Sequence, residues 1–167
     1  KPRDGTGSTL TFRIDNPRQL ARIARQLQRD GDEFQFVRQP FIDGLAVSCA
    51  VIVAAEQGRG VEALHVDVLL PCQQIVSDDG RFRYEGADFP GQLDRAMSDR
   101  VEHVVRQCCD VIPGLRGYVG FDLLIPHDSK GKLVSEPVIV DINPRLTTGY
   151  LLWRQLCDGN LAARMLE

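Results

Sequence analysis

Apolar positions along this chain switch between the period of a helix and that of a strand, and each switch marks an expected element. From Asn16 to Arg29 apolar residues recur with helical spacing, with Asn16 as N-cap, Pro17 at the first helical position and Gly31 as the stop. The same period predicts a longer helix from about Gly91 to Val111. The second helix is expected to face a core, and its stripe is not expected to bind a cofactor. The apolar positions are Leu20, Ile23, Ala24 and Leu27 in the first helix, and Leu93, Ala96, Met97, Val101, Val104, Val105 and Cys108 in the second.

Strands are predicted where apolar and β-branched residues run between turn residues. Residues 46–55 and 61–70 form an expected antiparallel pair, and 72–77 adds a further strand. The polar segment 78–90 is expected to be a loop, either an ordinary surface connection or one that faces substrate. Trp153 is expected to pack against the sheet, with stacking on a substrate as the alternative. Further strands are expected at 9–14 and 34–39, and short helices at 150–157 and 160–166, the second with Asn160 as N-cap.

Oxygen-bearing side chains lie on the last two expected strands. Asp122 sits inside an apolar run that the turn at 128–132 connects to a strand over 133–142. Side chains alternate along a strand, so Asp141 and Asn143 project from one side with Cα atoms roughly 6.6 Å apart, and the hairpin sets Asp122 opposite Asp141. Such oxygens suit a hard divalent cation such as Mg²⁺. The alternative is that they are solvated or hydrogen-bonded residues at strand ends.

A lysine and a small flexible loop begin the sequence. Glycines at positions 5 and 7 let backbone N–H groups approach an anion closely, and Thr6 and Ser8 add hydroxyl donors. This composition after Lys1 suits a bound phosphate. A plain hairpin turn is the alternative, because a short glycine-rich loop is a common feature.

Composition indicates a cytoplasmic enzyme rather than a nucleic-acid or membrane protein. The 167 residues are 43% hydrophobic and 26% charged, enough for one sizeable core or two small lobes. A net charge of -3 without a basic tract argues against nucleic acid as a partner. We see no apolar run of the ~20 residues that a membrane span needs. Metal-ligand spacing is absent from the cysteines and histidines, which are Cys49, Cys72, Cys108, Cys109, Cys157, His65, His103 and His127. We expect the cysteines to be reduced, mostly buried thiols.

In chain order these motifs resemble the ATP-grasp family. Residues 1–8 resemble its phosphate lysine and covering glycine loop, and Phe36 to Gly44 is similar to its adenine hinge. Gly120-Phe121-Asp122 and Asp141 to Arg145 resemble its two metal-binding strands. The likeness implies ATP and Mg²⁺ or Mn²⁺ as cofactors, with Asp122, Asp141 and Asn143 as metal ligands, Lys1 and Arg145 as catalytic residues, and Lys1, Gly5, Gly7, Ser8, Gln39, Pro40, Phe41 and Asp43 around the nucleotide.

The likeness also implies an architecture. We expect an α+β, partial ATP-grasp fold of antiparallel sheets packed with helices, holding nucleotide between two subdomains, residues 1–40 and 41–167. The family places an N-terminal domain before the lysine, so the chain is expected to be a C-terminal fragment that is inactive in isolation. Three departures stand out: that missing domain, Asp141 where the family usually has Glu, and Pro40, which has no N–H to offer adenine.

The implied activity is ATP-dependent ligation. A carboxylate and an amine are joined through an acyl phosphate, with small molecules as partners and a homo-oligomer possible. The sequence Asn143 to Thr148 looks most like the subgroup that includes tyramine-glutamate ligases and related carboligases. An ATP-grasp kinase or carboxylase stays open, as does a nucleotide-binding module that has lost catalysis.

Overall fold

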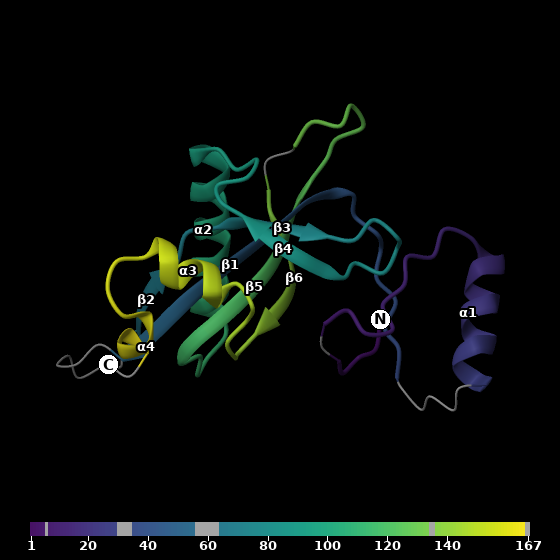
Figure 1. The fold of residues 1–167 in the computed structure, drawn as a ribbon, viewed down its shortest axis with the longest axis horizontal. Helices are drawn as coiled ribbons and strands as arrows, with labels where there is room; N and C mark the ends of the chain where they lie inside the picture. Colours follow the sequence, from purple (N-terminus) through teal and green to yellow (C-terminus); the bar gives the residue numbers. More distant parts are fainter. Residues whose placement is uncertain (6, 30–34, 56–63, 134–135, 166–167) are drawn as a thin grey trace. The chain divides into compact units, whose positions relative to one another are not determined.

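The chain divides into two compact units (Figure 1). The structure is a computed structural model that describes residues 1–5, 7–29, 35–55, 64–133 and 136–165. Unit 1 comprises Lys1–Phe41 and Ile75–Gly86, and unit 2 comprises Ile42–Gln74 and Ala87–Glu167. The division into subdomains 1–40 and 41–167 stays a prediction, while the first observed unit also takes in residues 75–86.

A sheet of antiparallel strands forms the framework of unit 2, and residues 75–76 and 84–86 of two of its strands fall in unit 1. Its strand order is β4-β3-β1-β5-β6, and β2 also pairs with β1. The central strand β1 pairs antiparallel with β2, β3 and β5, and β5 pairs antiparallel with β6. The predicted α+β class with an antiparallel sheet is therefore confirmed. The strands are β1 (Gly44–Ala55), β2 (Leu64–Val68), β3 (Cys72–Val76), β4 (Tyr84–Asp88), β5 (Gly117–Pro126) and β6 (Val138–Asn143).

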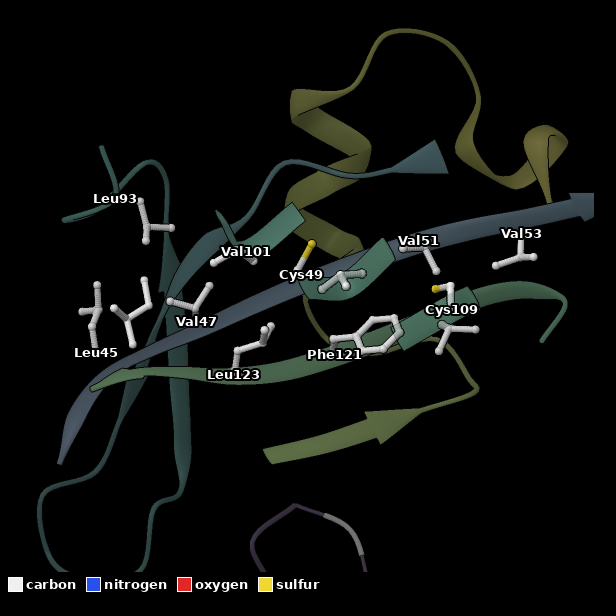
Figure 2. Close-up of a cluster of buried hydrophobic side chains, with 13 residues drawn as sticks. Leu45, Val47, Cys49, Val51, Val53, Leu93, Val101, Cys109, Phe121 and Leu123 are labelled. Atoms are coloured by element: carbon white, nitrogen blue, oxygen red, sulfur yellow. The ribbon is translucent and has the colours of Figure 1, made fainter. Parts of the chain in front are cut away.

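The main core lies between one sheet face and helix α2 (Arg95–Val111) (Figure 2). Alternate residues of β1 and β5 point into it, including the fully buried Val47 and Phe121. From α2 come Val101, Val105 and Cys109. The helix begins later than the predicted position 91, because Asp94 caps it by accepting a 2.7 Å hydrogen bond from the Met97 N–H. The predicted stripe is therefore core except at Ala96, which is exposed.

A second cluster covers part of the opposite sheet face. Two short helices, α3 (Tyr150–Leu156) and α4 (Leu161–Arg164), supply Trp153 and Leu161 to it. Trp153 is 0% exposed, and its Nε1 donates to the Leu70 carbonyl at 2.7 Å. Packing against the sheet is confirmed, and the ring has no free face for a substrate. The predicted N-cap is confirmed too, since Asn160 Oδ1 accepts from the N–H of Ala162 at 3.0 Å.

Unit 1 carries less regular structure. Helix α1 (Pro17–Arg29) forms as predicted, with Asn16 Oδ1 accepting from the Gln19 N–H at 2.9 Å. Of its apolar stripe only Ile23 is buried, and Leu20 is 46% exposed. Gly31, the predicted stop, lies outside the described residues, as do residues 56–60 between the two predicted strands of the antiparallel pair.

Three expectations about strands are wrong in part or whole. Residues 9–14 are not a strand, because Ser8 and Leu10 adopt positive φ and the Thr11 N–H turns back to the Ser8 carbonyl. Residues 35–39 form only a bridge, between Phe36 and Pro2. The expected loop 78–90 contains β4, whose turn closes through a 2.8 Å bond from the Ser77 N–H to the Arg83 carbonyl. No helix within the described ranges is long and apolar enough to cross a membrane.

Candidate metal and nucleotide site

Three predicted metal ligands meet on one face of unit 2. Asp122 lies directly opposite Asp141 in the β5–β6 register, and Gly120 lies opposite Asn143. Asn143 Nδ2 is 3.2 Å from Asp122 Oδ2 and 3.4 Å from Asp141 Oδ2. The predicted hairpin and its register are therefore confirmed. The two carboxylates point at the same small volume.

The Asn143 amide is turned in a defined way. Its nitrogen donates to both carboxylates, while its oxygen accepts from Arg145 Nη2 at 3.0 Å. Arg145, a predicted catalytic residue, thus lies within reach of the cluster and is exposed. The amide assignment follows from the network, since an arginine can only donate and a carboxylate can only accept.

Gln74 completes the cluster and was not predicted. Its Nε2 donates to Asp122 Oδ1 at 2.6 Å, and both side chains are partly buried. The sequence predicts that Gln74 lies on a strand, but it does not indicate which carboxylate the Gln74 side chain contacts. That information lies in the strand order, in which β1 separates β3 from β5.

The electrostatics favour a cation here. Burial raises the pKa of Asp122, and the neighbouring charge of Asp141 raises it further. The hydrogen bonds from Gln74 and Asn143 and the charge of Arg145 act in the opposite direction. Two adjacent carboxylates, one of them mostly removed from water, are stabilised by a positive ion between their oxygens.

A β-bulge sets the position of Asp141. The register shifts between Asp122 and Leu123, so that Leu123 pairs with Ile139 and Val140 is the additional residue. Ile139 and Ile142 both pack on the main core although they are three positions apart. In a regular strand an odd separation puts two residues on opposite faces. The bulge lets both isoleucines pack and leaves Asp141 on the carboxylate face.

The chain after β6 folds back over β5. A Cβ at Gly120 would lie 2.5 Å from Thr147 Cγ2, so glycine is required for this close approach. Thr147 Oγ1 and the Tyr118 hydroxyl are 2.8 Å apart. Burial raises the pKa of Tyr118 to about 12, so the phenol stays protonated and can hold this contact. The segment that carries Arg145 is therefore held to β5 through Thr147.

The residues present fit a hard divalent cation. Within the described part of the chain, no three His, Cys, Asp or Glu side chains gather as a metal site, so an amide has to serve as the third donor. Oxygens of Asp122 and Asp141 face the cluster and are ligands that Mg²⁺ accepts, and such sites are commonly completed by water and phosphate. Asn143 would supply its oxygen only after its amide turns, because that oxygen accepts from Arg145 here. The ligand assignment itself stays a prediction.

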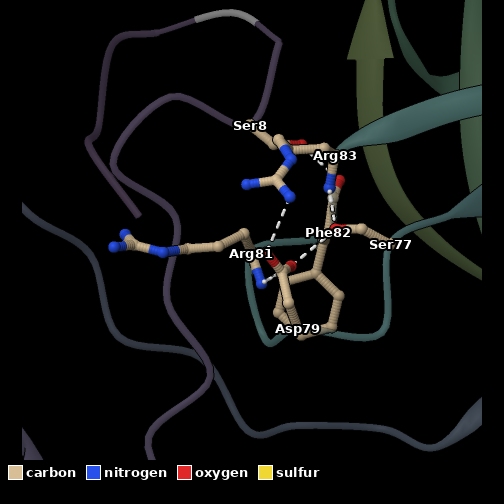
Figure 3. Close-up of polar contacts among 6 residues, drawn as sticks. All are labelled: Ser8, Ser77, Asp79, Arg81, Phe82 and Arg83. Carbon is tan, nitrogen blue, oxygen red and sulfur yellow. Dashed lines mark hydrogen bonds and ion pairs between the residues drawn. The ribbon is translucent and has the colours of Figure 1, made fainter.

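The predicted phosphate loop lies in unit 1. Gly7 and Ser8 both have positive φ, and the Ser8 hydroxyl donates to the Phe82 carbonyl at 2.6 Å (Figure 3). The Ser8 hydroxyl is therefore engaged by the protein, while open space surrounds Gly7. Thr6 lies outside the described residues. The Lys1 carbonyl accepts from the Val37 N–H at 2.9 Å, which joins the predicted lysine to the predicted hinge.

The segment under Ser8 is a polar turn. Asp79 accepts from the Ser77 hydroxyl at 2.7 Å and from the Arg81 N–H at 3.1 Å, and it pairs with Arg83 at 2.8 Å (Figure 3). These contacts, above all the Ser77 hydrogen bond, lower the pKa of Asp79. The turn thus holds the Phe82 carbonyl that Ser8 contacts.

The predicted hinge is irregular and open. Gln39 and Pro40 are exposed, and Phe41 is 50% exposed while its ring stacks on Phe82 at 6.0 Å between centroids. Asp43 belongs to unit 2, where its carbonyl accepts from the His127 N–H at 3.0 Å. The phosphate loop and Gln39 to Phe41 thus belong to one unit, and Asp43 and the metal cluster to the other.

Comparison of the sequence with models of known families gives a match. The ATP-grasp domain model matches residues 1–149. The chain belongs to the ATP-grasp family. Members of this family are typically ATP-dependent ligases that use ATP and Mg²⁺. A comparison with curated proteins gave no significant match.

Two solved structures share this ATP-grasp fold over part of their length. A putative ATP-grasp superfamily protein from Archaeoglobus fulgidus is 25% identical with a TM-score of 0.59, covering 77% of this chain and 36% of its own. An L-amino acid ligase from Bacillus licheniformis is 19% identical with a TM-score of 0.57, covering 90% of this chain and 32% of its own. The chain thus spans about a third of the length of these ATP-grasp proteins.

Proposed function

We propose that this protein is an ATP- and Mg²⁺-dependent ligase that joins a small-molecule carboxylate to an amine. The observation that carries the proposal is the convergence of Asp122, Asp141 and Asn143, with Arg145 on the same amide. Family membership supports the use of ATP. The fold shared with an L-amino acid ligase is consistent with an amino acid as one substrate.

The proposed reaction has two steps, phosphoryl transfer and amide formation. A carboxylate oxygen of the substrate attacks the γ-phosphorus of ATP, the bond to the bridging oxygen breaks, and ADP leaves. The amine nitrogen then attacks the acyl carbon, the C–O bond to phosphate breaks, and the amide, phosphate and a proton are released. Each step builds or moves negative charge on phosphate oxygens, so catalysis consists of positioning and charge neutralisation.

Each predicted residue has a role in these steps. Asp122, Asp141 and Asn143 hold the cation, which neutralises phosphate charge when bound. Arg145 offsets charge on the transferred phosphoryl group, and Lys1 does so from the glycine loop. The loop around Gly5, Gly7 and Ser8 supplies N–H groups to phosphate. The hinge residues Gln39, Pro40 and Phe41 provide backbone to adenine, and Asp43 approaches the ribose.

Hydroxylamine trapping tests the proposal in the intact protein. With ATP, Mg²⁺ and a panel of amino acids and other carboxylates, a ligase converts its activated carboxylate into a hydroxamate in step with ADP release. Asp122→Asn is the matched control and should abolish both. ADP release with a stable phosphorylated product and no hydroxamate would indicate a kinase, and strict dependence on bicarbonate a carboxylase. ATP binding without any ADP release would indicate a module that has lost catalysis.

A further inference from the structure

Gln74 reaches the metal cluster from a strand that does not neighbour the one it contacts. In the register across the sheet, Ser48 of β1 pairs with Cys72 on one side and with Asp122 on the other. Gln74 lies two residues beyond Cys72 and so on the same face. Its side chain crosses β1 to place Nε2 2.6 Å from Asp122 Oδ1. Ser48 is small and buried, which leaves room for this crossing.

The contact assigns the two oxygens of Asp122 to different partners. Its Oδ1 accepts from Gln74, and its Oδ2 accepts from Asn143 Nδ2. The same Asn143 nitrogen also contacts Asp141 Oδ2. Asn143 is itself a proposed ligand, so its long 3.2 Å hydrogen bond to Asp122 Oδ2 would give way to a cation, whereas the 2.6 Å hydrogen bond from Gln74 would keep Oδ1 occupied. Asp122 would then offer a cation one oxygen.

Monodentate ligation distinguishes between cations. Mg²⁺ requires an octahedron of single oxygens at about 2.0–2.1 Å, whereas Ca²⁺ takes 6–8 oxygens at about 2.3–2.6 Å and readily uses both oxygens of one carboxylate. We propose that Gln74 is a positioning residue that fixes Asp122 as a one-oxygen ligand and thereby makes the site select Mg²⁺ or Mn²⁺ over Ca²⁺. This inference rests on the proposed function, since it requires a metal–nucleotide site at Asp122.

The test compares metal-dependent nucleotide binding in the intact protein. Calorimetry gives the affinity for the ATP analogue AMP-PNP with Mn²⁺, with Ca²⁺ and in EDTA, and the ratio of each metal value to the EDTA value is the enhancement due to that ion. Gln74→Leu removes the donor and keeps the bulk of the side chain. Gln73→Leu is the matched control, because Gln73 lies on the other sheet face, where its Oε1 accepts from the Gln92 N–H at 2.9 Å.

In Gln74→Leu we expect the Mn²⁺ enhancement to fall about 10- to 100-fold, the usual range for residues that orient a ligand. The Ca²⁺ enhancement should hold or rise, so that the Mn²⁺-to-Ca²⁺ ratio drops at least tenfold by the same reasoning. The EDTA affinity should stay at the parent value, which a general structural defect would lower. Gln73→Leu should keep the parent ratio. Gln74→Asn has a side chain one methylene shorter and should lower the Mn²⁺-to-Ca²⁺ ratio by a smaller factor. If Gln74→Leu does not fold, the ratio measured for Gln74→Asn tests the proposal instead.

The outcomes separate this inference from the function that it extends. If Asp122→Asn removes the Mn²⁺ enhancement while the Gln74 variants keep the parent ratio, the selectivity role is wrong and the metal site stands. If the parent shows no Mn²⁺ enhancement, the proposed metal site fails and the inference fails with it. An equal drop in both enhancements and in the EDTA affinity would mean that Gln74 only supports the fold.

Discussion

The metal cluster of unit 2 and the glycine loop of unit 1 are built in different ways. Asp122, Asp141 and Gln74 stand on strands of one hydrogen-bonded sheet, over a core in which Phe121 and Val47 are fully buried. Ser8 instead stands on an irregular segment with positive φ, in a unit whose helix buries only Ile23. The register of a sheet fixes distances between side chains, whereas the loop depends on a few polar contacts. We therefore expect mutations in the two regions to act differently.

The largest difference should appear in stability. Phe121→Ala removes a fully buried ring from the main core and should lower the free energy of unfolding of unit 2 by about 3–5 kcal/mol. Ile23→Ala should cost about 2 kcal/mol or less, because the helix around it is largely exposed. Amide hydrogen exchange checks both. Loss of protection in β1 and β5 after Ile23→Ala would contradict the separation into two units.

The next difference concerns turnover at the metal cluster. Asp141→Asn removes a charge that faces the proposed cation, so turnover should fall about 100-fold or more. A 100-fold fall corresponds to about 2.7 kcal/mol of lost transition-state stabilisation. Asp141→Glu restores the carboxylate usual in the family and should keep measurable activity. Phosphate release with a panel of amino-acid acceptors is the measurement. Full activity in Asp141→Asn together with a dead Asp122→Asn would make Asp141 a structural strand residue.

A smaller effect is expected at the hinge of unit 1. If the backbone of Gln39 to Phe41 binds adenine, ATP should bind about 5- to 30-fold more tightly than GTP or CTP, since one or two hydrogen bonds of about 1 kcal/mol each depend on the base. Competition binding against ATP measures this preference. Equal affinities for the three nucleotides would mean that the segment only connects the two units.

The smallest effect should come from the turn beneath Ser8. Ser77→Ala removes the hydrogen bond that contributes most to lowering the pKa of Asp79, so this pKa should rise toward its ordinary value. A lowered folded-state pKa adds stability above the unfolded-state pKa, and that stability is lost as pH falls through the folded-state pKa. The variant should therefore lose less of its stability in acid. Carboxyl NMR titration tests it, and an unchanged Asp79 pKa would show that Arg81 and Arg83 dominate.

Sequence patterns predicted what depends on neighbours along the chain. Alternation and a turn gave the pairing of Asp122 with Asp141, and helical spacing gave α2 and its buried stripe. The contact between Gln74 and Asp122 was missed because it depends on which strands adjoin in the sheet. The strand expected at 9–14 was wrong because positive φ at Ser8 and Leu10 interrupts an otherwise suitable sequence. The bulge at Val140 has no composition signal, since it arises from packing two isoleucines on one core.

The bulge also changes what the edge of the sheet offers to strands of other molecules. Among the described strands β6 is at the end of the order, and Val138 and Val140 on it are 37% and 38% exposed. A straight apolar edge offers free N–H and C=O groups to strands of other molecules and invites aggregation. A bulge twists such an edge and breaks the regular spacing that an added strand would need. The irregularity that leaves Asp141 facing Asp122 thus also discourages edge-to-edge pairing of β6.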